Sequence, residues 1–156
     1  MFGDLSEERI EHVLKYQLLG HIGCHENDKT YIVPICYAYD ENCIYARTYE
    51  GVKITMMRNN PRVCFQVEHL ESMGNWQSVI CWGQFEELTD ANKRNKGIAV
   101  LQKRVSAIVD DKNLRASHHW PFSLEDSDGI EGIIFCIHIS EKTGKFENSS
   151  INNDYS

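Results

Sequence analysis

The sequence predicts a mainly β fold with flanking helices, in which antiparallel strands close into a barrel that associates with a second copy of itself. Short segments rich in Val, Ile and Tyr follow one another between residues 19 and 48 with only turn-length gaps. Such gaps favour antiparallel pairing, because parallel strands need long crossover connections. The segment 75–88, NWQSVICWGQFEEL, is apolar or aromatic on both alternating faces, so each face must be covered. A barrel interior on one side and a partner subunit on the other meet this requirement.

Helices are expected in three places. Asp4 is placed to cap an N-terminal helix in which apolar residues then recur on one face. The second helix is short, residues 52–60, and ends before Pro61. Thr89 is placed to cap the third, whose apolar residues recur at helical spacing and in which Gly97 is a weak point.

Strands are expected in the remaining apolar segments. Alternation in RVCFQVEH puts Val63, Phe65 and Val67 on one face, which is the pattern of a half-buried strand. The loop LESMG then separates it from the next strand. In chain order, the expected strands are residues 19–26, 30–40, 43–48, 62–69, 75–88 and 130–140.

Length and composition limit the possible classes of protein. The 156 residues fit one domain, which we expect to span residues 1–145, with a frayed tail at 146–156. A formal net charge of −7 argues against nucleic acid and anionic membranes as partners, and no apolar run is long enough for a membrane helix. The N-terminus lacks a basic segment followed by an apolar one, so a cytoplasmic location is expected. The six cysteines stand singly without a Cys-x-x-Cys pair, which predicts free thiols and no metal centre.

The stretch ARTYEGVKITMMRNNP, residues 46–61, predicts a strand, a tight bend at Gly51 and the start of a helix. The first amides of a helix lack intrahelical acceptors and lie at the positive end of its dipole, so they favour an anion. Lys53 falls in this first turn, and Arg47 and Thr48 end the strand before it. A phosphate would therefore meet backbone amides, a hydroxyl and two cations. The alternative is a solvated surface turn, since neither Walker nor dinucleotide glycine spacing is present.

A ligand held at this bend also needs a flat apolar body. Two or three charge-assisted hydrogen bonds supply about 4–8 kcal/mol, which the cost of association can consume. Pro34 interrupts a strand, so it indicates either an edge strand or a strand whose backbone faces a ligand ring. Trp76 and Ser78 would offer that ring a stacking surface and a hydrogen bond, although Trp76 fits a core or interface position equally well.

Taken in order, YIVPICYAYDENCIYARTYEGVKITMMRNNPRVCFQVEHL and then NWQSVICWGQFEEL resemble the FMN-binding split-barrel family related to pyridoxamine 5'-phosphate oxidase. The likeness is nearest to the nitroimidazole-resistance-type branch and covers residues 18–88. It implies a homodimer of six-stranded antiparallel split barrels, with two FMN sites across the interface. The residues that the resemblance places at FMN are Lys53, at the phosphate, with Arg47, Thr48, Gly51, Val52, Val33, Pro34, Ile35 and Cys36 from one subunit, and Ser78 and Trp76 from the facing subunit.

The resemblance implies an FMN-dependent oxidoreductase. A reduced nicotinamide nucleotide would pass electrons to FMN, and a small electron-poor acceptor such as a nitro compound would take them. No catalytic residue is assigned, because the flavin carries the electron chemistry. Arg47 stands where the nitroimidazole-resistance branch often has a histidine, and the oxidases' C-terminal substrate segment has no counterpart here. The first departure weighs against that branch's substrate chemistry. The second, together with Tyr31 in place of the oxidases' phosphate-binding arginine, argues against pyridoxamine phosphate oxidation.

Other interpretations stay open at this point. The chain could bind flavin without turnover, as a store or a redox sensor, or it could be a split barrel that binds haem. His118 and His119 are adjacent in a polar stretch with no obvious third ligand, so they do not predict a metal site. That stretch is interpreted as a solvated loop or as a lid near the flavin.

Overall fold

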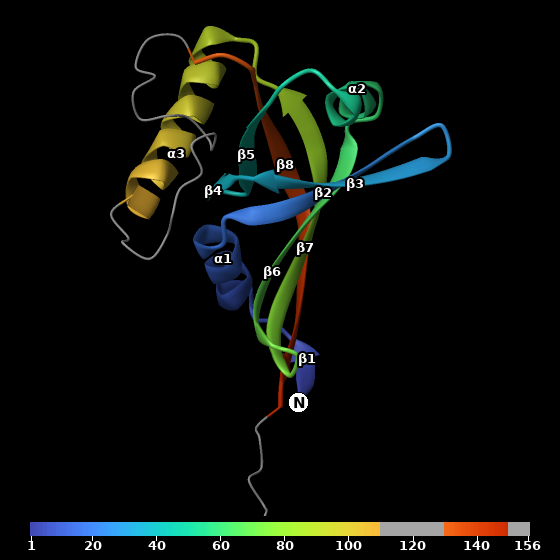
Figure 1. The fold of residues 1–156 in the computed structure, drawn as a ribbon, viewed down its shortest axis with the longest axis vertical. Coiled ribbons are helices and arrows are strands. Elements are labelled where there is room, and N and C mark those ends of the chain that lie inside the picture. Colours follow the sequence, from blue (N-terminus) through green and yellow to red (C-terminus); the bar gives the residue numbers. More distant parts are fainter. Residues whose placement is uncertain (110–129, 150–156) are drawn as a thin grey trace, which may run out of the picture.

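The computed structural model describes residues 1–109 and 130–149, which form three helices and eight strands in one antiparallel sheet (Figure 1). The helices are α1 (Glu7–Tyr16), α2 (Val52–Asn59) and α3 (Ala91–Val109). The strands are β1 (Phe2–Asp4), β2 (Leu19–Glu26), β3 (Lys29–Cys36), β4 (Ala38–Asp40), β5 (Cys43–Thr48), β6 (Arg62–Ser72), β7 (Asn75–Glu87) and β8 (Ile133–Asn148). The predicted fold class, a mainly antiparallel sheet with flanking helices, is confirmed. Six of the strands have six residues or more, and β1 and β4, which have three each, are additional to the six expected.

A single residue, Tyr37, forces the sheet to close on itself. The strand order is β3-β2-β6-β7-β8-β5-β4, so β3 and β4 lie at opposite ends of the sheet. In a flat sheet these ends would be about 30 Å apart, at about 4.8 Å per strand. Yet β3 ends at Cys36 and β4 begins at Ala38. The sheet must therefore curl into a barrel, and the strand expected at 30–40 is broken at Tyr37 for this reason.

The tight turns of the meander have the geometry that their residues favour. Asn27 and Asp28 have φ of 50° and 60°, and Glu41 and Asn42 have φ of 44° and 61°. Positive φ at both central residues defines the type I′ turn, whose twist matches that of the flanking strands. Asn and Asp tolerate this conformation better than other residues with side chains. The two turns predicted from the sequence are therefore present, and they fix the register of the two hairpins.

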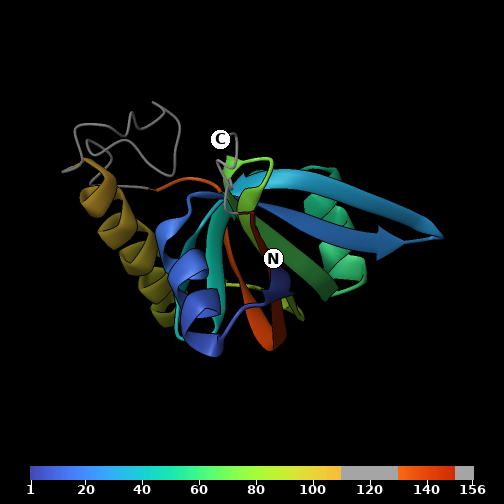
Figure 2. The same cartoon turned by 90° about the horizontal axis from the view of Figure 1, so that it is seen from below.

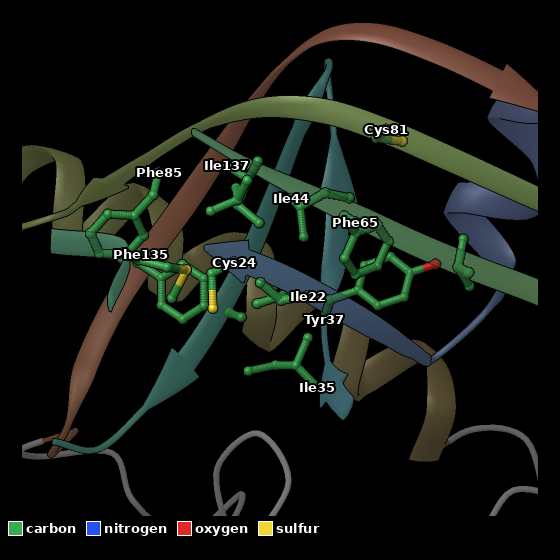
Figure 3. Close-up of a cluster of buried hydrophobic side chains, with 14 of the residues drawn as sticks. Ile22, Cys24, Ile35, Tyr37, Ile44, Phe65, Cys81, Phe85, Phe135 and Ile137 are labelled. Carbon is green, nitrogen blue, oxygen red and sulfur yellow. The ribbon is translucent and has the colours of Figure 1, made fainter. Parts of the chain in front are cut away.

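One apolar core fills the barrel, and Figure 3 shows its central side chains. The rings of Tyr37 and Phe65 meet nearly edge to face, with centroids 4.7 Å apart. Gly20 makes room for this pair, since a Cβ there would lie 2.2 Å from the ring of Phe65. The Tyr37 hydroxyl donates to the carbonyl of Leu14, 2.8 Å away, in the last turn of α1. The two shorter helices complete the same core with Ile10, Val13 and Leu14 from α1 and Ile54, Met56 and Met57 from α2.

Replacing Tyr37 by Phe is expected to lower the free energy of unfolding by about 1–3 kcal/mol, because a buried carbonyl loses its hydrogen-bond donor. Tyr16→Phe is the matched control, since the Tyr16 side chain is exposed. Urea unfolding of the two variants measures the difference. Equal midpoints for both variants would contradict this role of the Tyr37 hydroxyl.

The outside of the barrel is covered unevenly. Helix α3 packs over β4, β5 and β8 (Figures 1 and 2). Leu101 lies there in a second apolar cluster with Tyr45 and Ile134. Gly97, expected to weaken this helix, permits close packing, since a Cβ there would lie 2.9 Å from Leu88 and 3.0 Å from Ile134. No described helix covers the outward side chains of β3, β2, β6 and β7. We call this surface the open face; its outward residues include Leu19, Ile32, Pro34, Gln66, Ser78, Ile80 and Trp82.

Several predicted boundaries are wrong, and each error has a local cause. Ser6, not Asp4, caps α1, because Asp4 belongs to β1 and contacts Lys145. Asp90, not Thr89, accepts from the first turn of α3, through the amide of Lys93. The strand expected at 62–69 extends to Ser72, and the loop expected after it is the end of a hairpin.

The tail expected from residue 146 begins too early. β8 continues to Asn148, and its final residues pair with β1 on one side and β7 on the other. This pairing depends on residues far apart in the sequence, so local composition could not indicate it. The rest of the expected tail, residues 150–156, lies outside the described residues, as do His118 and His119. None of the described helices combines the length and hydropathy needed to cross a membrane.

Candidate functional site

The N-terminus of α2 is the predicted phosphate position, and it lacks a side-chain cap. Gly51 is the N-cap residue, and its extended backbone leads from β5 into the helix without a side-chain hydrogen bond. By contrast, Ser6 accepts from the first turn of α1, and Asp90 accepts from the first turn of α3. The first amides of α2 have no acceptor four residues earlier in the helix. They are therefore available to an anion, which the helix dipole also favours.

Lys53 is a half-buried cation in this first turn. Its ammonium makes no hydrogen bond or ion pair within residues 1–109 and 130–149. Burial lowers the pKa of Lys53, and the nearby thiol of Cys24 acts in the opposite direction. A carboxylate partner would ordinarily offset the cost of burying this charge. The geometry suits an anion supplied from outside the chain.

The acidic residue next to the bend, Glu50, is paired with Arg58, which Glu87 also shares. Arg58 lies in the last turn of α2 and donates to both oxygens of Glu50 at 2.9 Å. It also donates to both oxygens of Glu87 in β7 at 2.8 Å. These bonds tie α2 to the strand before it and to the barrel, which fixes the position of its N-terminus.

Hydrogen bonds from Arg58 hold the pKa of Glu87 below its ordinary value of 4.5. Because the folded pKa is lower than the unfolded one, the pair stabilises the fold above pH 4.5 and loses that contribution as the pH falls through the folded pKa. Glu87→Gln should therefore lose less stability than the parent on acidification below this pH, with a small difference because the pair is partly exposed. Urea midpoints at neutral and acidic pH measure this, with Glu8→Gln as an exposed control. An unchanged pH dependence in Glu87→Gln would contradict the assignment.

The strand before the bend places its two predicted ligands on opposite faces. Thr48 is buried on the inner side of β5, and its hydroxyl donates to the carbonyl of Tyr49, 3.4 Å away. The neighbouring Arg47 points outward, donates to the Tyr49 hydroxyl and lies over that ring at 5.3 Å. At Gly51 and Val52 only backbone groups are suitably placed for a phosphate, and the Val52 side chain is exposed. Among the residues predicted at this end, Lys53 has the most suitable surroundings for a phosphate.

The ring-facing segment predicted at 33–36 belongs to β3, which is the first strand in the sheet order. Pro34 pairs with His21 of β2 and is exposed, so an edge strand explains how the sheet tolerates a proline. Val33 and Ile35 pack into the core, whereas Pro34 and Cys36 alternate with them and face outward. A ring at this strand would meet the open face.

Trp76 and Ser78 lie on β7 and share the outward side of the barrel with Pro34. The Trp76 indole donates to Glu147 at 2.9 Å, and the Ser78 hydroxyl accepts from Gln66 at 3.0 Å. Two strands, β2 and β6, separate β7 from β3, so the strands are about 14 Å apart within one chain. One flavin ring could not touch all these residues within a single chain. This arrangement is the one expected if Trp76 and Ser78 reach a ring held by the facing subunit.

A groove of about 540 Å³ crosses the open face. Its volume lies within the range of about 300–1,000 Å³ common for small-molecule and cofactor sites. Cys24 lines this groove, and the pKa of its thiol is raised by burial and by Cys64 and lowered by Lys53. The lining residues are Gly23, Cys24, His25, Thr30, Ile32, Arg62, Val63, Cys64, Trp82, Gly83, Gln84 and Ser140.

The sequence reasoning missed Arg62 and Trp82 as groove residues. Trp82 carried a signal, because it falls on the same alternating face as Ser78 and Ile80. Arg62 carried none, since a single charged residue at the start of a strand is common. Its position depends on the pairing of β6 with β2 and β7.

The pyridoxamine 5'-phosphate oxidase family matches residues 6–131 of the chain. An uncharacterized protein of Rhizobium meliloti, RA0666, is 30% identical over 145 residues, covering 90% of this chain and 92% of that protein. Among solved structures, a FAD-binding protein from Mesorhizobium loti has a TM-score of 0.73 and 26% identity, and 95% of this chain and 99% of that chain are covered. A candidate 5-nitroimidazole antibiotic resistance protein from Bacteroides thetaiotaomicron has a TM-score of 0.68 and 16% identity, with 94% and 87% covered. The extent of the family match and the 30% identical relative show that this chain belongs to the pyridoxamine 5'-phosphate oxidase family.

Proposed function

We propose that the chain binds FMN between two copies of itself and works as a flavin-dependent oxidoreductase. The observation that carries the proposal is Lys53, a half-buried cation without a partner among the described residues, beside the uncapped N-terminus of α2. The family and the similarity to a protein described as FAD-binding support a flavin as the ligand. A terminal phosphate at the helix start favours FMN, because the adenylate of FAD would have to extend beyond this position.

The homodimer is part of the same proposal, and the open face supports it. Ile32 is 68% exposed, Leu19 52%, Trp82 39% and Ile80 37%, all on this one face. Several large apolar side chains exposed on one face favour an interface there. A two-fold axis through the face would bring Trp76 and Ser78 of one copy toward β3 and α2 of the other. Two equivalent sites would follow from the symmetry.

The chain's own groups would bind and orient the cofactor. Lys53 and the first amides of α2 would hold the phosphate by charge-assisted hydrogen bonds. The exposed edge of β3 would lie against the ring, and Ser78 and Trp76 of the other copy would offer a hydroxyl and an aromatic surface. The flavin supplies the electron-transfer chemistry when bound. The protein would therefore position the flavin and exclude water from it. A reduced nicotinamide nucleotide would donate the electrons, and a small electron-poor compound would accept them.

Nitro compounds are the acceptor class that we propose. The similarity to a candidate nitroimidazole resistance protein supports this acceptor class, although at 16% identity that similarity shows a shared fold only. Arg47 stacks on Tyr49 on the outer side of β5, which supports a role other than that of a histidine beside the ring. We therefore expect the nicotinamide-dependent reaction to tolerate loss of the Arg47 charge.

Turnover tests the function as a whole. The full chain, loaded with FMN, should oxidise NADH or NADPH faster when a nitroaromatic acceptor is added, and the parent should lose this activity when FMN is removed. A protein that binds FMN stoichiometrically but shows no such acceleration with any nitro compound would be a flavin store or sensor. Titration with FMN and FAD side by side, followed by flavin fluorescence, tests the cofactor, and tighter binding of FAD would overturn the choice of FMN.

A further inference from the structure

A second cluster of reactive side chains lies near the start of α3, next to the end of the groove that Gln84 and Ser140 line. Cys136 and His138 are two residues apart on β8, so they project from the same face of the strand. Glu86 of β7 is paired directly with Cys136 in the sheet. The sulfur, one ring nitrogen and one carboxylate oxygen of these three residues all lie within 4.8 Å of one another. This cluster plays no part in the proposed flavin site.

The two distances that join His138 to Cys136 and to Glu86 are those expected between ligands of one metal ion. The His138 Nε2 lies 3.3 Å from the Cys136 Sγ and 3.5 Å from the Glu86 Oε1. Zinc binds sulfur at about 2.3 Å and nitrogen or oxygen at about 2.0–2.2 Å. At tetrahedral angles, ligand atoms at these lengths are about 3.4–3.6 Å apart. An ion would therefore need only small side-chain movements to bind all three.

Two neighbours hold the ligands in this orientation. The Cys43 Sγ lies 3.5 Å from the other ring nitrogen of His138, Nδ1. In the tautomer with a proton on Nδ1, this contact leaves Nε2 free to face Cys136 and Glu86, as in metal sites where the second nitrogen is held by an outer partner. Lys93 lies 3.5 Å from Oε2 of Glu86, the oxygen that does not face His138. The Lys93 charge would repel a metal ion bound at this oxygen pair. The affinity for the ion therefore depends on the Cys136 sulfur acting as a ligand.

We propose that Glu86, Cys136 and His138 form a binding site for zinc or a similar thiophilic divalent cation. The mixed sulfur, nitrogen and oxygen set suits Zn²⁺, whereas Mg²⁺ and Ca²⁺ prefer oxygen ligands alone. Three protein ligands leave one position of a tetrahedral ion for water or a further group. The ion would tie β7 to β8 beside the helix that covers this side of the barrel.

Zinc binding by the full chain, purified with a chelator and then dialysed, tests the proposal. Competition with a chromogenic zinc indicator should show one Zn²⁺ per chain. His138→Ala should weaken binding at least ten-fold, and this variant should fold, because the side chain is 53% exposed. Cys136→Ser and Glu86→Gln should weaken it similarly. Co²⁺ in place of Zn²⁺ should give a thiolate-to-cobalt charge-transfer band that Cys136→Ser removes.

The matched control is His69→Ala. His69 also lies beside a carboxylate, with Nε2 3.2 Å from Glu71, but no cysteine of the described residues joins this pair. The His69→Ala variant should keep the zinc affinity of the parent. Equal affinity in the parent, His138→Ala and Cys136→Ser would overturn the site, and so would a parent that takes up no stoichiometric zinc. The readout does not use flavin, so its failure leaves the proposed function untouched.

Discussion

Ile80→Asp is expected to convert the protein to a monomer and to remove most of its flavin affinity. Ile80 is 37% exposed on the open face, and the proposed two-fold axis would bury it against the second copy. Burying an unpaired carboxylate costs several kcal/mol, and each dimer would contain two. A loss of about 4 kcal/mol corresponds to roughly a thousand-fold weaker association. Light scattering coupled to size exclusion measures the mass, and an FMN titration of the same sample measures the affinity.

Tyr16→Asp is the matched control for this substitution. Tyr16 is an exposed apolar side chain at the end of α1, outside the open face. The Tyr16→Asp substitution should leave both the mass of the protein and its FMN affinity unchanged. Circular dichroism should show that both variants fold. A folded Ile80→Asp monomer that binds FMN as tightly as the parent would show that the site is complete within one chain.

Lys53→Met is expected to weaken FMN binding by roughly ten- to one-hundred-and-fifty-fold, because it removes a charge-assisted bond of about 1.5–3 kcal/mol. The same substitution should not destabilise the free protein. Burial lowers the pKa of Lys53, which means that the folded chain disfavours its charged form. Met keeps most of the side-chain volume and removes that cost, so the urea midpoint without flavin should stay the same or rise.

The control for Lys53→Met is Lys15→Met, which removes an exposed lysine near the end of α1. It should keep the parent's FMN affinity. Isothermal titration of both variants with FMN and with riboflavin separates the phosphate from the ring. Lys53→Met should lose affinity for FMN and keep its weaker affinity for riboflavin. An equal loss for both ligands would place Lys53 away from the phosphate.

Local signals in the sequence were sufficient for most of the fold. The turn at Asn27-Asp28 could be predicted because Asn and Asp tolerate positive φ, and the turn at Glu41-Asn42 because only two residues separate the strands on either side. Pro61 follows the end of α2 as expected. The break at Tyr37 could not, because it results from closure of the whole barrel. The end of β8 was missed for the same kind of reason, since it pairs with the N-terminal strand β1.

In the candidate site, too, residues close in sequence could be placed from the sequence, whereas residues brought together by strand pairing could not. Gly51 and Lys53 are close in sequence, so the sequence alone could place them at one helix start. Arg47 and Thr48 seemed to belong with them, but strand alternation points their side chains to opposite faces of β5. The groove and the cluster of Glu86, Cys136 and His138 depend on strand register. Within one strand, alternation did carry a signal: it placed Trp82 on the face of Ser78 and Ile80, and Cys136 on the face of His138.

The flavin content and the mass of the purified protein together test the central claim most directly. The full chain should be incubated with excess FMN and passed over a size-exclusion column, with protein mass and the visible flavin absorbance recorded across the same peak. We predict one FMN per chain in a peak with the mass of two chains. A colourless peak, or a haem spectrum in place of the flavin spectrum, would contradict the account.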